Sequence, residues 1–328
     1  MKIGLTYDLR DHYLKMGFSD EETAEFDRES TIDAIESAIK ANGYDVERIG
    51  NIKDLVKALS NNKTWDIVFN ICEGLYGRYS REAQVPALLE AYNIPYTFSD
   101  PLVMSISLKK DMAKKIVRSA GFKTPDFFVI KNIDDITKVK NIEYPLFIKP
   151  IAEGTSKGVN DKSKVNSYDE LYTNSLYLLK KYKQPIIVET FCPGREFTAG
   201  IIGTGDECQY IGALEVILKQ GAEKNAYTYQ NKEKCEELIE YSLVTDDEIN
   251  SKLSKLSTSI WKLLECRDAG RIDFMLDRDN ELSFLEVNPL SGLHPTHSDL
   301  PILWTKIGKN YNDLIGFIIN SVKKRIGL

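Results

Sequence analysis

Residues 270–289, GRIDFMLDRDNELSFLEVNP, contain two short runs in which apolar and polar side chains alternate. In the first run Ile272 and Phe274 fall on one face. Arg271 and Asp273 fall on the other face, which is the period-two pattern of a half-buried strand. The second run, LSFLEVN, alternates in a similar way, so the stretch predicts two adjacent strands.

The connection between the two runs decides which polar side chains meet. The dipeptide Asp-Asn at 279–280 tolerates left-handed backbone angles and predicts a two-residue hairpin turn. With that turn, Asp273 lies opposite Glu286, and Arg271 lies opposite Asn288, with Cβ atoms roughly 5 Å apart. Two carboxylates and an amide oxygen beside an arginine suit a Mg²⁺ ion that also bridges nucleotide phosphates. An ordinary surface hairpin with cross-strand ion pairs has the same pattern, so other motifs must support this interpretation.

The composition narrows the class of protein. The chain has 328 residues, enough for two or three domains, and its formal net charge of -6 argues against a nucleic-acid binder. The five cysteines are far apart and there are three histidines, which disfavours a disulfide framework or a zinc site. No run of apolar residues is long enough for a membrane span, and the start MKIGLTYD reads as a strand, so we expect a cytoplasmic protein with no membrane partner.

The order of predicted elements indicates an α/β fold. Strand patterns at 2–8, 44–50, 65–70 and 94–98 alternate with helical patterns at 29–41, 52–60 and 82–92, which predicts a parallel sheet. The segment 9–28 is polar and is expected to form a loop or short helix. No G-x-G-x-x-G follows the first strand, so a dinucleotide site is disfavoured. A lysine-rich helix ending at 120–121, a strand pair at 126–130 and 145–150, further strands and a long helix near 246–265 follow, with boundaries expected near 99 and 189.

A second motif lies at 147–159, FIKPIAEGTSKGV. A strand delivers Lys149 to its end, and a small, hydroxyl-rich loop with Gly154, Ser156 and Gly158 follows. Glycines let backbone N–H groups approach phosphate oxygens, and the lysine would neutralise their charge. The pattern is not a Walker loop, because G-x-x-x-x-G-K-S/T is absent. A mobile surface turn explains the same residues equally well.

A third motif is the strand PIIVET and its continuation to Thr198. Glu189 ends an otherwise apolar run, where a carboxylate could accept a hydrogen bond from the amine of a buried adenine. Glu196 could then reach the ribose hydroxyls. An exposed glutamate at a strand end is the simpler alternative.

The order of these motifs resembles the ATP-grasp superfamily, and most closely the D-alanine:D-alanine ligase family. The resemblance rests on a lysine helix, K-P-x-x-E-G-x-S-x-G, E-x-x-x-x-G-x-E-F-T, G-R-I-D and L-E-V-N-P, and it covers most of the chain. It implies an ATP-grasp fold preceded by a Rossmann-like parallel-sheet domain. The implied domains are 1–98, 99–189 with the phosphate loop, and 190–328 with the metal and acceptor sites.

The resemblance also implies roles for residues that bind the cofactors ATP and Mg²⁺. Two Mg²⁺ ions, replaceable by Mn²⁺, would be held by the metal ligands. Lys110 and Lys149 are expected at the phosphates of ATP, and Glu153 to Gly158 are expected to form a lid in which Ser156 is the most useful hydroxyl. Glu189, with the backbone near Thr190 and Cys192, is expected at adenine. Glu196 is expected at ribose. The expected metal ligands are Asp273, Glu286 and Asn288, and the expected catalytic residues are Arg271, Ser156 and Lys232.

Substrate residues follow the family less closely. Glu25, with Glu29 as the alternative, is expected at the first substrate, and Lys232, Gly292 and Ser298 are expected at the second. Ser291 stands where the family has a proline, and His294 where it has a small hydroxyl residue. The family's H-G turn is E73-G74 here, and Arg78 and Arg81 nearby could read an extra acidic group. These differences leave the identity of the amino acids open.

The chemistry implied is amide formation through an acylphosphate, with D-alanyl-D-alanine as the expected product and a homodimer as a possible assembly. Three alternatives stay open on sequence grounds. A related ligase would join a different amino acid pair or a small carboxylate, an ATP-grasp kinase would phosphorylate a small acid without an acceptor amine, and a nucleotide-binding regulator would catalyse nothing.

Overall fold

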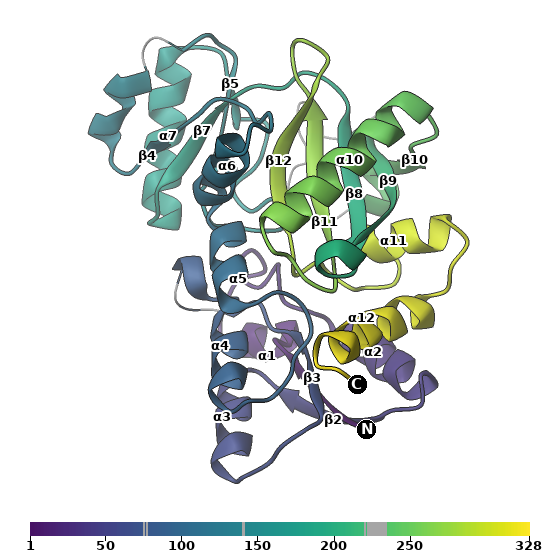
Figure 1. The fold of residues 1–328 in the computed structure, drawn as a ribbon. Helices are drawn as coiled ribbons and strands as arrows, with labels where there is room; N and C mark the ends of the chain where they lie inside the picture. The colour runs from purple at the N-terminus through teal and green to yellow at the C-terminus, as the bar shows by residue number, and fades with distance from the viewer. Residues whose placement is uncertain (75, 77, 140–141, 220, 222–234) are drawn as a thin grey trace.

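A computed structural model describes residues 1–328 apart from 75, 77, 140–141, 220 and 222–234 (Figure 1). The described strands form three sheets, which follow one another along the chain. The predicted α/β class is confirmed, because a parallel sheet at the N-terminus precedes two antiparallel sheets.

The first sheet has the order β2-β1-β3 and is parallel, as predicted. Its strands are β1 (Lys2–Tyr7), β2 (Asp45–Gly50) and β3 (Ile67–Ile71), and its helices are α1 (Arg10–Lys15), α2 (Glu29–Ala41), α3 (Ile52–Ser60) and α4 (Gln84–Ala91), with a 3-10 turn at Arg78–Ser80. The strand predicted at 94–98 is wrong. Only an isolated bridge joins Val68 to Tyr96, because Pro95 lacks an N–H donor and Phe98 takes a left-handed backbone angle.

The last helix, α12 (Tyr311–Arg325), packs against α2 beside this first sheet (Figure 1). Helix α2 buries Ile32, Ile35 and Ile39, whose spacing of three and four residues gives one apolar face. Leu314 and the other apolar residues of α12 share the same core. The first and last parts of the chain therefore form one packed unit beside the other two sheets.

The second sheet has the order β4-β7-β5-β6. Its elements are α5 (Pro101–Leu108), α6 (Lys110–Ser119), β4 (Phe127–Ile130), a 3-10 helix (Ile133–Val139), β5 (Leu146–Pro150), β6 (Lys164–Val165), α7 (Tyr168–Tyr182) and β7 (Ile186–Thr190). The pairing predicted between 126–130 and 145–150 is wrong, since β7 lies between β4 and β5 and pairs with both. A local pattern identified each strand but could not identify its neighbour.

The third sheet has the order β10-β9-β8-β11-β12 and carries the hairpin. Its elements are β8 (Glu196–Ile202), a 3-10 turn (Gly205–Glu207), β9 (Gln209–Leu218), α9 (Cys235–Leu238), β10 (Ile239–Leu243), α10 (Asp247–Leu263), β11 (Ala269–Leu276), β12 (Leu282–Asn288) and α11 (Asp299–Lys306). Helix α10 covers one face of this sheet (Figure 1). Trp261 and Phe274 are buried there. The opposite face carries the polar side chains of β11 and β12.

Cys72, Cys192, Cys208 and Cys266 are buried free thiols. Within the described residues, no helix combines the length and the apolar character that crossing a bilayer requires.

Candidate active site

The hairpin β11–β12 brings the predicted polar cluster together. Arg271 pairs with Asn288 and Asp273 pairs with Glu286, as predicted. Asn288 Nδ2 donates to Asp273 Oδ2 at 3.1 Å, so the amide and carboxylate are in direct contact. We call Arg271, Asp273, Glu286 and Asn288 the hairpin cluster.

The turn between β11 and β12 is longer than the predicted two-residue turn. Asp277 N donates to the carbonyl of Glu281, so three residues rather than two form the loop, and Asn280 supplies the left-handed angle. A bulge between Asp273 and Phe274 shifts the pairing by one residue. The longer turn and the bulge cancel, which is why the pairs at the cluster are those predicted from a two-residue turn.

Arg271 is held by carboxylates on two elements. Its Nη1 lies 3.2 Å from Asp273 and 2.6 Å from Asp299 Oδ2, at the start of α11. Thr198 of β8 donates to Asp273 and also contacts Arg271. Burial raises the pKa of Asp273 above its ordinary value, although the charge of Arg271 opposes that rise, and Glu286 adds to it. Negative charge is therefore concentrated on this face of the sheet.

A cavity between the second and third sheets collects most of the residues predicted to bind ATP. The predicted residues that line it are Lys110, Lys149, Glu153, Ser156, Glu189, Thr190, Cys192 and Glu196, together with Asp273 and Glu286 of the hairpin cluster. Apolar walls come from Phe147, Phe191, Met275 and Leu285 among others. The three separate sequence motifs thus meet around one cavity, here called the nucleotide cavity.

Glu189 lies between two lysines at this cavity. Its carboxylate is 2.7 Å from Lys114 Nζ and 3.1 Å from Lys149 Nζ, and all three side chains are buried. Burial alone would raise the pKa of Glu189, but the charges of Lys114 and Lys149 lower it. The glutamate is therefore ionised, and it holds the end of β5 against α6.

Lys114 serves the fold rather than the cavity, which it does not line. Its ammonium contacts Glu189, Thr124 Oγ and the carbonyl of Phe284. We expect Lys114→Met to lower the free energy of unfolding by about 3–5 kcal/mol, because it leaves a buried carboxylate with one fewer cation. Chemical denaturation measures this loss. Lys255→Met, at an exposed position of α10, is the control, and equal stability of both variants would contradict the prediction.

Glu196, at the start of β8, faces other carboxylates. Burial raises its pKa to about 8, and the charges of Asp273 and Glu286 add to that rise. It is thus mainly protonated at neutral pH and able to donate a hydrogen bond.

The loop after β5 closes one end of the nucleotide cavity. Lys110 Nζ donates to the carbonyl of Glu153 at 2.7 Å and lies 3.4 Å from Glu286, so it links the loop to the hairpin cluster. Thr155 and Ser156 both have left-handed backbone angles, which are costly for residues with a Cβ. Gly154 has no Cβ, and a Cβ there would collide with Glu25.

A second cavity adjoins the first and contains the predicted substrate residues that the structure describes. It is lined by Glu25, Gly292 and Ser298, by Arg271, Glu286 and Asn288, and also by Lys110, Glu153, His294, His297 and Asp299. We call it the substrate cavity. Lys232, predicted at the second substrate and as a catalytic residue, lies outside the described residues.

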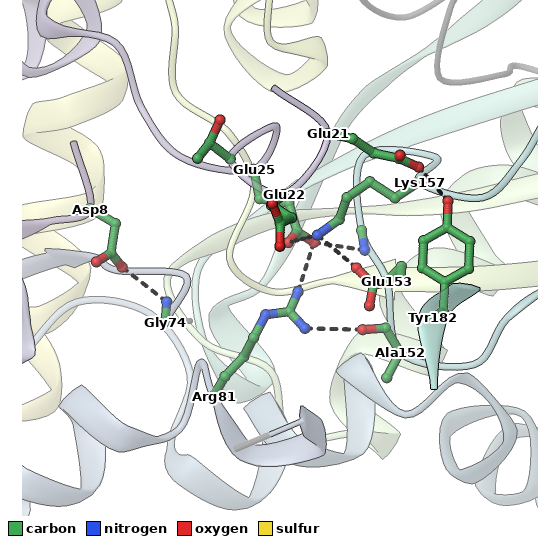
Figure 2. Close-up of polar contacts among 12 residues, drawn as sticks. Asp8, Glu21, Glu22, Glu25, Gly74, Arg81, Ala152, Glu153, Lys157 and Tyr182 are labelled. Atoms are coloured by element: carbon green, nitrogen blue, oxygen red, sulfur yellow. Dashed lines mark hydrogen bonds and ion pairs between the residues drawn. The ribbon is translucent and has the colours of Figure 1, made fainter. Parts of the chain in front are cut away.

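The wall of the substrate cavity formed by the N-terminal region differs from expectation (Figure 2). Glu25 binds Arg81, Lys157 and the N–H of Gly154, whereas the alternative, Glu29, pairs with Arg48 away from both cavities. Arg78 and Arg81 line neither cavity. The expectation that they read an acidic substrate is wrong for Arg81, because the protein's own Glu25 engages its guanidinium.

The loop between β12 and α11 forms the other wall. Ser291 Oγ donates to the carbonyl of Asn288, and Ser298 Oγ accepts from the N–H of His294. Gly292 lies so close to Ser298 that a Cβ would approach its hydroxyl at 2.7 Å. The rings of His294 and His297 are 4.6 Å apart, and both residues line the cavity.

The donor atoms of the hairpin cluster suit Mg²⁺. Asp273, Glu286 and Asn288 offer hard oxygen atoms, and Arg271 and Lys110 already lie beside the two carboxylates. Among the described residues, no three His, Cys, Asp or Glu side chains form a complete metal site. The set therefore fits an ion whose remaining ligands come from phosphates and water.

Glu82 is a further buried carboxyl group on the wall of the substrate cavity, 3.5 Å from Arg81. Burial raises its pKa to about 7, although Arg81 opposes the rise and Glu25 adds to it. The folded state therefore binds more protons than the unfolded state between about pH 4.5 and 7, and stability falls as the pH rises through this window.

We expect Glu82→Gln to remove much of this fall, which is on the order of 3 kcal/mol in the wild type. Unfolding in denaturant at pH 5 and pH 8 measures it. Identical pH dependence in both proteins would show that Glu82 is ionised in the folded state.

Two residues of the site escaped the sequence analysis. Lys157 belongs to the phosphate loop but was not singled out, and Asp299 follows Ser298 without a recognised pattern. Their partners, Glu25 and Arg271, are far away in the sequence. A lysine inside a loop already expected to bind phosphate was the available signal for Lys157.

Known proteins resemble this chain in sequence. A family model described as "D-ala D-ala ligase C-terminus" matches residues 116–320. The D-alanine–D-alanine ligase of Aquifex aeolicus is 34% identical over 286 residues, covering 87% of this chain and 92% of the relative. An uncharacterised protein of Sinorhizobium fredii, y4sG, is 28% identical over 304 residues, covering 89% and 87%.

Solved structures share the fold. The D-alanine–D-alanine ligase of Bacillus anthracis complexed with ATP superposes with a TM-score of 0.73 at 23% identity, covering 99% of this chain and 98% of that chain. The VanG D-Ala:D-Ser ligase of Enterococcus faecalis has a TM-score of 0.74 at 21% identity, covering 98% and 99%.

Proposed function

Because the chain belongs to the D-alanine–D-alanine ligase family, we propose that it is an ATP-dependent ligase that joins two molecules of D-alanine. The observation that carries the proposal is the convergence of the lysine, glutamate and hairpin motifs on two adjoining cavities. Glu153 and Glu286 line both, so a phosphate in the first would lie beside a carboxylate in the second.

The proposed reaction has two steps. The carboxylate of the first D-alanine attacks the γ-phosphorus of ATP, which gives an acylphosphate and releases ADP. The amine of the second D-alanine then attacks the acyl carbon and phosphate leaves, so no protein nucleophile is required. Loss of a proton from the ammonium of the second substrate precedes its attack.

Protein groups have defined tasks in this scheme. Lys110 and Lys149 neutralise the phosphates, Glu189 with the backbone at Thr190 and Cys192 holds adenine, and Glu196 contacts ribose. Ser156 and its loop cover the triphosphate. Arg271, which is already fixed by two carboxylates, stabilises charge that develops on the transferred phosphoryl group and on the oxyanion.

Asp273, Glu286 and Asn288 would hold two Mg²⁺ ions, which Mn²⁺ could replace. Such ions supply charge neutralisation between phosphate oxygens. The residues themselves provide a fixed set of oxygens, because the hairpin register and the contact from Asn288 to Asp273 hold them together.

At the substrates, Glu25 is proposed to bind the ammonium of the first amino acid. Gly292, Ser298 and Lys232 are proposed to hold the carboxylate of the second. The three domains proposed are 1–98, 99–189 and 190–328, with the two cavities where they meet.

The test measures phosphate release with ATP and Mg²⁺ across single and paired D- and L-amino acids, with mass spectrometry of each active mixture. Release with D-alanine alone and formation of D-alanyl-D-alanine would support the proposal. Product only with another pair would assign a different ligase, phosphorylated acid without amide would assign a kinase, and ATP binding without turnover throughout would favour a regulator.

A further inference from the structure

Lys157 connects the two cavities. It lines the nucleotide cavity, and its ammonium lies 2.6 Å from Glu25 Oε2, on the wall of the substrate cavity (Figure 2). The same ammonium lies 2.6 Å from Glu153, which lines both cavities. Lys157 is 8% exposed, so these contacts occur away from bulk water.

Both carboxylate oxygens of Glu25 already accept hydrogen bonds from groups of the protein. Its Oε1 accepts from Arg81 Nη2 and from the N–H of Gly154, both at 2.7 Å, and Oε2 accepts from Lys157. The Glu25 side chain is 5% exposed. An incoming ammonium group would find another ammonium in its place.

The partners of Glu25 differ in how easily they can leave. Arg81 is fixed at a second point, because its Nη1 donates to the carbonyl of Ala152 at 3.0 Å. The N–H of Gly154 belongs to the backbone of the loop. Lys157 has a flexible four-carbon stem and lines the cavity where a triphosphate would enter. It is the partner that an arriving nucleotide can attract.

We propose that Lys157 exchanges partners when a nucleotide binds. In the free protein its ammonium occupies Glu25, and in the nucleotide complex it contacts the triphosphate and leaves Glu25 Oε2 for the ammonium of the first amino acid. A triphosphate presents several charged oxygens and competes well with single carboxylates for a lysine. The vacated, buried Glu25 then lacks one cation, which favours an ammonium ligand.

This inference rests on the proposed function for the identity of the amino acid. It adds a residue that couples the two sites. The nucleotide therefore binds more tightly to the protein that already holds the first substrate than to the free protein, and the first substrate binds more tightly to the nucleotide complex. Such coupling is reciprocal.

The nucleotide half is tested without any amino acid. Isothermal titration calorimetry with a non-hydrolysable ATP analogue and Mg²⁺ compares wild type, Lys157→Met, Glu25→Gln and the double variant. We expect Lys157→Met to weaken binding about tenfold. When Lys157 is present, Glu25→Gln should tighten binding of the analogue about threefold or more, because Lys157 no longer has to break an ion pair with Glu25. In the Lys157→Met background Glu25→Gln should have no effect on this affinity.

One control and one replacement variant accompany this cycle. Lys181→Met breaks the neighbouring ion pair with Glu21, at 2.7 Å, but lines neither cavity, so its affinity should equal that of the wild type. If Lys157→Met fails to fold, Lys157→Gln completes the same cycle. An equal effect of Glu25→Gln with and without Lys157 would show simple repulsion of phosphate by Glu25 and would overturn the exchange.

The amino-acid half is tested by equilibrium dialysis with labelled D-alanine. Wild type should bind D-alanine only with the analogue present, whereas Lys157→Met should bind it in both conditions. Equal binding by wild type in both conditions would overturn the exchange. An intact nucleotide cycle with no D-alanine binding in any protein would instead support the exchange and contradict the proposed substrate.

Discussion

Lys149→Ala is expected to lower kcat/KM for ATP by about 10²- to 10³-fold, the loss seen when one fixed donor to a developing charge is removed. The side chain of Lys149 is buried at the end of β5, lines the nucleotide cavity and lies 3.1 Å from Glu189. Because Glu189 keeps its contact with Lys114 at 2.7 Å, the variant should retain the position of Glu189. Initial rates of ADP formation at varied ATP concentration measure the loss.

The nucleoside provides an internal control for this variant. Adenosine lacks phosphates, so its affinity should be unchanged in Lys149→Ala, while the affinity for the ATP analogue falls. Lys114→Met should give the opposite pattern. Its stability should fall, but its affinity for the ATP analogue should be kept because Lys149 is still present. Normal ADP formation by Lys149→Ala would remove this lysine from the phosphate site.

Structural features that depend on residues close together in the sequence could be predicted. The 29–41 and 52–60 helices have the predicted bounds, because apolar spacing and a capping box at Asn51 and Asp54 are local signals. The pairing of Asp273 with Glu286 was also predicted from one hairpin, but it is correct because the longer turn and the bulge cancel. The two helices need no knowledge of the rest of the fold.

Features set by distant contacts were missed. The position of β7 between β4 and β5 depends on which strands bury each other, and the bulge before Phe274 interrupts the β11–β12 pairing without any alternating-pattern signal in the sequence. Arg81 was expected to face a substrate, yet its partner Glu25 lies 56 residues earlier in the chain. Sequence spacing gives no measure of such a pair.

The candidate site shows the same division. Most of the predicted ATP residues line one cavity, and within each motif these residues are neighbours on a strand or loop. The charge balance of the site is collective, however. Glu189 has two lysines and a lowered pKa, whereas Glu196 has carboxylate neighbours and a pKa raised to about 8. Two glutamates with similar sequence patterns therefore have opposite protonation states.

Asn288→Asp is expected to lower turnover on the order of 10²-fold or more, while making the protein more responsive to Mg²⁺. Asn288 Nδ2 donates to Asp273 Oδ2 at 3.1 Å, and the substitution replaces this donor by a second carboxylate. Without metal the two carboxylates repel, so the melting temperature should fall. Added Mg²⁺ should restore more of it than in the wild type, because the ion now binds three carboxylates.

The same added charge explains the loss of turnover. The additional carboxylate reduces the net positive charge that the metal ions present to the phosphates of ATP. The variant should therefore bind the ions more tightly but transfer the phosphoryl group more slowly. Asn280→Asp places an identical charge in the turn of the same hairpin, where Asn280 has a left-handed angle that Asp tolerates, and should leave turnover unchanged. Undiminished ADP formation by Asn288→Asp, with an unchanged response of the melting temperature to Mg²⁺, would place the metal ions elsewhere.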